Sequence, residues 1–288
     1  MSTLSYKILI LTITYLLLRI FLFIDVTDEM QYYGQILSLQ RTGMLFYDDL
    51  FIQQLPYILI YHLNYLWIKF YGIDYFIIFN RTIFAVLLFV LYFYWRNILK
   101  SVYREFKYSE IFSLILVVNV GFHGIFTLNY NTGSMIIWTT IFLTLLSGKY
   151  NRVSTTITPL LCLFHLPSLF VAITLQFIFI FANYRDKLLE FILSTFISLA
   201  IIVVYVFQFT NLENLKEAYN FSKSFGVGTF IFSDITQSTT TIVFIIISIL
   251  VLFIGYNDKL NVGRLRINLE LLTILVSVLL LFVFIIDL

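Results

Sequence analysis

The chain has 288 residues, of which 60% are hydrophobic and only 12% are charged, and its formal net charge is +2. Because soluble domains carry about 25% charged residues, this composition excludes an ordinary soluble globular protein and predicts a polytopic membrane protein. The single cysteine, Cys162, excludes an internal disulfide and argues against a metal site built from cysteines.

Hydrophobic segments recur along the whole chain. A helix needs about 20 apolar residues to cross a bilayer, and residues 5–24 form the first such segment. It has no small-residue cleavage site, so we expect a retained anchor. Further spans are expected at 74–95, 110–127, 135–147, 188–207, 239–255 and 268–286, with 153–164 and 168–183 as two arms of a hairpin. The sequence therefore predicts an all-α membrane helix bundle of about nine spans, forming one domain over 1–288.

The first loop, residues 25–72, is long and polar at its start. It holds five acidic residues, namely Asp25, Asp28, Glu29, Asp48 and Asp49. Residues 29–42 have helical character, and residues 56–70 form an aromatic, partly apolar segment. Since Tyr and Trp favour the membrane–water boundary, we expect 56–70 to lie in the interface, with a crossing as the alternative.

Basic residues mark one side of the predicted membrane topology. They are Lys7, the cluster in 96–107, Lys149 with Arg152, Arg185 with Lys187, and Lys259 with Arg264 and Arg266. The positive-inside rule makes this side cytoplasmic. The loop 25–72, the turn 129–134, the turn at His165 and the segment 208–238 then fall on the extracytoplasmic side.

Two acidic pairs in the first loop are candidates for chemistry. Adjacent carboxylates such as Asp28 and Glu29 raise each other's pKa and can act as a base or bind a cation, and the alternative is a solvated acidic loop. Asp48 and Asp49 form a second pair, for which helix capping or solvation is the alternative.

Basic and histidine side chains on the same side offer further candidates. Arg81 opens the second span and is expected either to extend to lipid headgroups or to grip a phosphate or the loop carboxylates, and Arg19 is similar. His165 is either a capping residue or a contact for phosphate or acceptor. The scattered His62 and His123 are expected to be structural. The sequence has neither a glycine-rich phosphate loop after a strand nor a nucleophile elbow.

The order of motifs in this loop resembles a known family. The motifs are Asp28-Glu29-Met30-Gln31-Tyr32-Tyr33, Arg41-Thr42-Gly43, Tyr47-Asp48, Pro56, Phe70-Tyr71-Gly72 and Phe79-Asn80-Arg81. This order is similar to the first extracytoplasmic loop of GT-C glycosyltransferases, which include protein O-mannosyltransferases and lipid A aminoarabinose transferases. Tyr130-Asn131-Thr132-Gly133-Ser134 resembles a turn of bacterial members. The resemblance covers about residues 15–150, and beyond them only the topology.

The resemblance implies a polyprenyl-phosphate sugar donor and an inverting transfer to an envelope glycan, lipid or protein acceptor, without nucleic acid. Asp28 matches the base of the family, and Glu29 would support it. The expected donor-phosphate or substrate-binding residues are Arg81, Asp48, Asp49, Tyr130, Asn131 and His165. A divalent cation, Mg²⁺ or Mn²⁺, between the carboxylate pairs is left open. The implied location is the bacterial inner membrane, with the active site on its extracytoplasmic side.

The sequence also departs from the family pattern. Gln53, Gln54 and Leu55 precede Pro56 where many relatives have a basic residue and a second proline, so His165 or Arg19 would have to supply that phosphate contact. The short chain suggests a membrane protein partner. The alternative function is a non-enzymatic translocase or accessory subunit for lipid-linked glycans, although few charges lie at mid-membrane. A transporter of soluble substrates is third, because no internal repeat is present.

Overall fold

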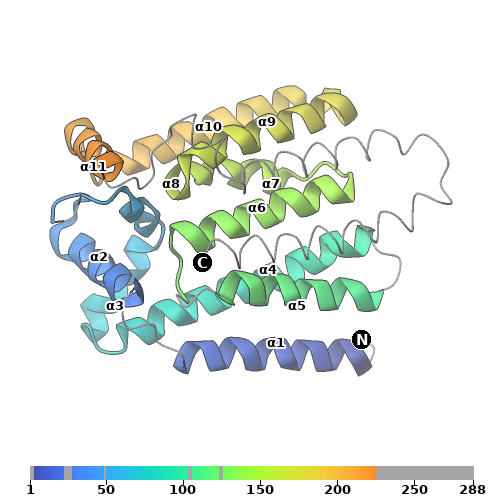
Figure 1. The fold of residues 1–288 in the computed structure, drawn as a ribbon, viewed down its shortest axis with the longest axis horizontal. Coiled ribbons are helices and arrows are strands. Elements are labelled where there is room, and N and C mark those ends of the chain that lie inside the picture. The colour runs from blue at the N-terminus through green and yellow to red at the C-terminus, as the bar shows by residue number, and fades with distance from the viewer. Residues whose placement is uncertain (1–2, 23–27, 49, 103–105, 123–125, 225–288) are drawn as a thin grey trace. The chain divides into compact units, whose positions relative to one another are not determined.

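The computed structural model describes residues 3–22, 28–48, 50–102, 106–122 and 126–224 (Figure 1). Within these ranges every regular element is an α-helix or a 3-10 helix, which confirms the all-α prediction. The chain divides into two compact units, Met1–Thr229 and Phe230–Leu288, and all described residues belong to the first. The expected spans 239–255 and 268–286, and also Asp49 and His123, lie outside the described residues. The single domain over 1–288 stays a prediction.

Two helices of the described ranges are long and apolar enough to cross a membrane: α4 (Phe76–Val102, 27 residues) and the helix Arg185–Val206, whose main part is α10 (Leu188–Val206). They match the expected spans 74–95 and 188–207. The helices α1 (Thr3–Phe21), α5 (Phe106–Phe122) and α6 (Tyr130–Ser147) match three further segments, but the number of crossings stays a prediction.

The aromatic segment 56–70 does not form a single helix. A 3-10 helix, η1 (Ile52–Ile60), contains Pro56, and α3 (Tyr61–Tyr71) follows it. Proline lacks an N–H and restricts its own backbone, which fits the irregular helix around it. The 11 residues of α3 rise about 16 Å, well short of the roughly 30 Å of a bilayer core. Whether 56–70 lies in the interface or crosses the membrane stays a prediction.

One end of the bundle is built by α2 (Asp28–Thr42), η1, α3 and α11 (Leu212–Ser224), and we call it the loop end (Figure 1). The turn after α10 reaches the same end, because the Leu45 N–H donates to the Phe209 carbonyl at 2.7 Å. Tyr205 of α10 also donates its hydroxyl to the Ile58 carbonyl, at 3.1 Å. The loop 25–72 is therefore fixed to the bundle by residues from far along the chain.

Apolar residues from these segments share one core at the loop end. Helix α2 contributes Tyr32, Tyr33, Ile36 and Leu39. Ile36 follows the two tyrosines by four and three residues and precedes Leu39 by three, so all four lie on one helix face. The other buried members come from later segments and are Leu45, Phe46, Leu55, Tyr57, Ile58, Ile60, Phe76, Leu163, Ile202, Val206, Phe209 and Ala218. Burial of this face holds α2 against the bundle.

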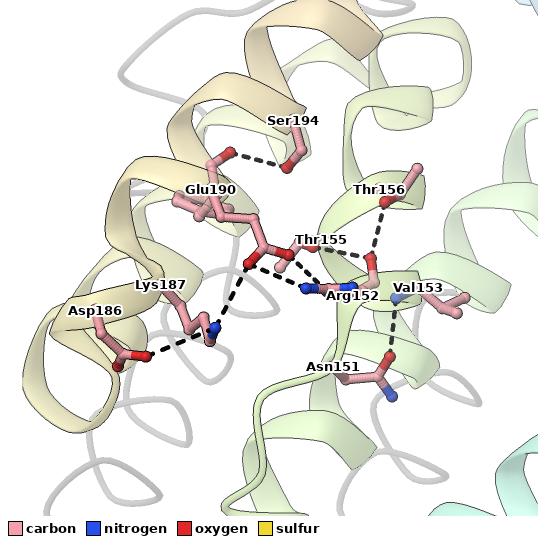
Figure 2. A network of polar contacts seen from close by, with 10 residues as sticks. Asn151, Arg152, Val153, Thr155, Thr156, Asp186, Lys187, Glu190 and Ser194 are labelled. Atoms are coloured by element: carbon pink, nitrogen blue, oxygen red, sulfur yellow. Dashed lines mark hydrogen bonds and ion pairs between the residues drawn. The ribbon is translucent and has the colours of Figure 1, made fainter.

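The opposite end of the bundle (Figure 1) holds a polar network that includes Arg152 and Lys187 (Figure 2), and we call it the basic end. Arg152, at the start of α7 (Arg152–Ile157), contacts Glu190 of α10 with 2.6 Å between Nε and Oε1. Lys187 Nζ lies 3.9 Å from the other oxygen of Glu190 and 3.7 Å from Asp186. Exposed pairs of this kind contribute little stability. A buried ion pair at 3.6 Å, between Arg96 of α4 and Glu110 of α5, links these two helices.

Gly133 allows α6 and the segment before His165 to approach closely. A Cβ atom at this position would lie 1.9 Å from Cε1 of Phe164, so the ring must move to admit alanine. We expect Gly133→Ala to lower the free energy of unfolding by about 1–3 kcal/mol, as overpacking does. Thermal unfolding in detergent measures this.

Gly34 provides the matched control in α2. A Cβ there meets no atom within 4 Å, and alanine favours the helix over glycine. Gly34→Ala should therefore leave stability unchanged or raise it by up to about 1 kcal/mol. Equal unfolding temperatures for wild type and Gly133→Ala would contradict the packing argument.

Candidate functional site

The first turns of three helices meet at the loop end. Tyr33 of α2 packs edge-on against Phe76, the first residue of α4, with 6.1 Å between ring centroids. Tyr32 packs in the same way against Tyr130, the first residue of α6, at 6.3 Å. Asp28 is the first residue of α2, so its backbone lies in this region. Acidic residues are favoured in the first turn of a helix, where the backbone N–H groups create partial positive charge.

Arg81 is buried one turn into α4, with only 1% of its surface exposed. Its Nη1 donates to the carbonyl oxygens of Arg19, Ile20 and Leu22, each at 3.2 Å. The last carbonyls of a helix have no partner within the helix and carry partial negative charge, so a cation is favoured there. Arg81 therefore caps the end of α1 and does not extend to lipid headgroups. Nearby, the Arg19 guanidinium lies 5.2 Å from the ring centroid of Phe126.

A pocket of about 300 Å³ opens between the end of α1 and the start of α4. Its lining residues are apolar except for Arg81 and the partly polar Tyr75, and they are Ile20, Phe21, Ile73, Tyr75, Phe76, Ile77, Ile78 and Arg81. Apolar walls beside a guanidinium suit an amphiphile with an anionic group such as phosphate. Arg81 was a candidate from the sequence, but Ile73 and Tyr75 were not. These two residues precede Arg81 by eight and six positions in a segment rich in large apolar residues.

The polar stretch 129–134 is the start of α6. The Asn129 Oδ1 accepts from the N–H groups of Asn131 and Thr132 at 2.8 and 3.0 Å, and the Thr132 hydroxyl accepts from the Asn129 N–H at 3.0 Å. This reciprocal capping explains why the sequence begins a helix here. Tyr130 lies beside Tyr32, and the side chain of Asn131 is exposed at the loop end. A substrate contact by Tyr130 or Asn131 stays a prediction.

His165 lies in the turn between α8 (Leu161–Phe164) and α9 (Leu166–Asn183) and caps α9. Its Nδ1 accepts from the Ser168 N–H at 3.3 Å and lies 2.6 Å from the Ser168 hydroxyl. Desolvation by nearby protein atoms lowers the pKa of His165. Because Nδ1 accepts the Ser168 N–H, the neutral ring carries its proton on Nε2. The capping alternative is thus what the structure shows, and a contact with phosphate or acceptor stays a prediction.

Asp48 is held at the far end of α2. Its carboxylate accepts from the Ser38 hydroxyl at 2.6 Å and from Nη2 of Arg41. Ser38 and Arg41 follow Asp28 by 10 and 13 residues, so about 15–20 Å of helix separates Asp48 from the start of α2. Oxygen ligands lie about 2–2.6 Å from Mg²⁺ or a similar ion, and a cation between the two acidic pairs stays a prediction.

Other parts of the metal prediction stay open. Among the residues that the structure describes, no group of three or more His, Cys, Asp or Glu side chains could hold a metal ion. A divalent cation bound at Asp28 and Glu29 alone stays a prediction.

The Asp48 contacts predict a pH-dependent stability. The hydrogen bonds from Ser38 and Arg41 lower the pKa of Asp48 below its ordinary value of 3.8. A carboxyl whose pKa is lower in the folded state than in the unfolded state stabilises the fold at any pH above the unfolded-state pKa. This stabilisation is lost as the pH falls through the folded-state pKa. Wild type should therefore unfold at a higher temperature than Asp48→Asn at neutral pH, by a small difference that declines as the pH falls below about 4.

Thermal unfolding between pH 7 and pH 3 measures this, and Arg41→Gln is the matched variant. It removes one of the two partners and should show a reduced pH dependence. A difference between wild type and Asp48→Asn that stays constant with pH would contradict the prediction.

Comparison of the chain with family models, with characterised proteins and with solved structures finds no match. The arguments for function therefore rest on the motifs of the loop end and on the geometry described above.

Proposed function

We propose that this chain is an integral membrane glycosyltransferase of the GT-C type. It moves a sugar from a polyprenyl-phosphate donor to an envelope glycan, lipid or protein acceptor, with inversion, at the extracytoplasmic face of the bacterial inner membrane. The observation that supports the proposal is the apolar pocket with Arg81 in its lining, whose wall residue Phe76 packs against Tyr33 of α2. A lipid phosphate has an apolar chain that suits the apolar walls and an anionic group that suits Arg81.

In the proposed reaction Asp28 acts as the base. Its carboxylate accepts the proton of an acceptor hydroxyl while the hydroxyl oxygen bonds to the anomeric carbon. The bond between that carbon and the phosphate oxygen breaks, and its electron pair leaves with the polyprenyl phosphate. Arg81 stabilises the charge on the departing phosphate, and a site poor in water strengthens this interaction.

The distribution of elements supports a membrane topology with about nine spans. The described parts of the loop 25–72, the start of α6 and the turn between α8 and α9 occur at the loop end, while Arg152 and Lys187 occur at the basic end. Such a separation is what the positive-inside rule requires of a polytopic protein.

Helix α3 supports a position of the loop end at the membrane interface. It exposes Tyr65, Phe70 and Tyr71 together with Lys69. Aromatic and basic side chains of this kind favour the headgroup region. We propose that α3 lies in the outer interface and brings the pocket to the level of the donor phosphate.

Mass spectrometry of envelope glycans tests the proposed function. The strains to compare are one with the gene, one without it, and one that carries Asp28→Asn. The expected result is a difference of one sugar mass that requires the intact gene. No difference at normal protein levels would contradict the transferase, and lipid-linked intermediates accumulating without the gene would instead indicate a translocase or an accessory subunit.

A further inference from the structure

The turn between α3 and α4 contains two residues with left-handed backbone. Gly72 has φ +67° and follows the end of α3, where glycine is common. Tyr75, directly before α4, has φ +56°. Glycine adopts this conformation freely, whereas a side chain with Cβ is strained in it, and a bulky aromatic residue is rarely found there.

Several contacts hold Tyr75 in this conformation. The Phe76 N–H donates to the Ile73 carbonyl at 3.2 Å, and the Phe79 N–H donates to the Tyr75 carbonyl at 2.9 Å. Trp67 Nε1 donates to the Asp74 carbonyl at 3.1 Å, and its ring stacks on Phe79 with 4.3 Å between centroids. The turn is thus fixed on both sides of the strained residue.

Burial does not compensate for the strain at Tyr75. The other non-glycine residue with positive φ in the described part of the chain is Phe46, at +62°. Phe46 is 3% exposed and packs in the core of the loop end, so its burial offsets the strain. Tyr75 is 75% exposed. Strain that persists without burial is found where a side chain is held for a ligand.

The position of Tyr75 indicates that ligand. Tyr75 lines the same pocket as Arg81, in walls that are otherwise apolar. We propose that the strained turn holds Tyr75 at this pocket to contact an amphiphilic phosphate, the aromatic ring packing against the first carbons of the lipid chain and the hydroxyl donating to a phosphate oxygen. This inference rests on the proposed function, because it takes the lipid-phosphate donor as the ligand.

The experiment uses the purified full chain in detergent, with farnesyl phosphate as the probe. Without ligand, Tyr75→Gly should raise the unfolding temperature by about 2–4 °C, because the strain is removed. With ligand, the same variant should bind farnesyl phosphate about tenfold more weakly, as expected for the loss of one aromatic contact and one hydrogen bond. Tyr75→Phe, which keeps the ring, should lose less affinity.

Two controls make the result specific. Tyr47 is also an exposed tyrosine of the loop end but does not line the pocket, so Tyr47→Asn should bind farnesyl phosphate like wild type. Inorganic phosphate distinguishes the source of the phosphate. Wild type should bind it more weakly than farnesyl phosphate, and this weak binding should not depend on Tyr75.

The inference is overturned if wild type does not bind farnesyl phosphate. It is also overturned if Tyr75→Gly is stabilised but keeps wild-type affinity, or if inorganic phosphate binds as tightly as farnesyl phosphate. Binding is measured without any sugar. Unchanged envelope glycans in the strain without the gene would therefore reject the transferase and leave the Tyr75 contact standing.

Discussion

Replacing Asp28 with asparagine is expected to lower sugar transfer about 10²–10⁴-fold, which is the usual contribution of a general base. Asparagine has nearly the same shape and can occupy the first turn of α2, but its amide cannot accept the proton of the acceptor hydroxyl. The protein should therefore accumulate normally and bind farnesyl phosphate like wild type. The measurement is the transfer rate in membranes, normalised to the amount of protein.

Asp186→Asn is the matched control for this substitution. Asp186 is an exposed aspartate at the basic end, where its carboxylate lies 3.7 Å from Lys187. The same chemical change at that end should leave transfer unaltered. If Asp28→Asn transfers sugar at the wild-type rate, another residue is the base and the match of Asp28 to the family pattern is misleading.

Replacing Arg81 with methionine is expected to lower the free energy of unfolding by about 1–3 kcal/mol, the effect of leaving buried carbonyl acceptors without their donor. Methionine is similarly long and can fill much of the space. It leaves the carbonyls of Arg19, Ile20 and Leu22 without the donor that Nη1 supplies. Unfolding of purified protein in detergent measures the loss, and the binding of farnesyl phosphate should fall in the same variant.

Two further variants separate the parts of this effect. Arg41→Met removes an arginine that is largely exposed and pairs with Asp48, so it should change stability by at most about 1 kcal/mol. Arg81→Lys keeps the charge but lacks the planar fork, so it should recover part of the stability and little of the phosphate binding. An Arg81→Met protein as stable as wild type would show that the cap on α1 is unimportant.

The helices were predictable where local patterns decide them. The expected span 74–95 matches the start of α4, although the helix continues to Val102. The segment expected at 135–147 begins five residues earlier, at Tyr130, because Asn129 and Thr132 cap the helix. This capping signal was present in the sequence. The break between η1 and α3 depends on Pro56 and on packing against residues far along the chain, so the sequence alone could not place it.

Residues of the candidate site could be named from the sequence, whereas their contacts could not. The place of Arg81 at the start of a span is a local property. Its three bonds to the end of α1 join residues about 60 positions apart and require the folded bundle. The backbone conformation of Tyr75 was equally unpredictable, since neither composition nor spacing predicts a positive φ for tyrosine. Ser38 and Arg41, the partners of Asp48, lie nearby in sequence. A loop has no regular repeat from which the direction of the Asp48 side chain could be predicted.

The shared core of the loop end has a consequence for biosynthesis. Residues 32–60 are made early, but they pack against Leu163, Ile202, Phe209 and Ala218, which are made up to about 185 residues later. At 5–20 residues per second, the early segment waits roughly 10–40 s for its last partners. During that time its tyrosines and isoleucines are exposed to solvent, lipid or a chaperone. Nascent chains halted before Ile202 should therefore be cut within 25–72 by an added protease, whereas chains that have passed Ala218 should resist it.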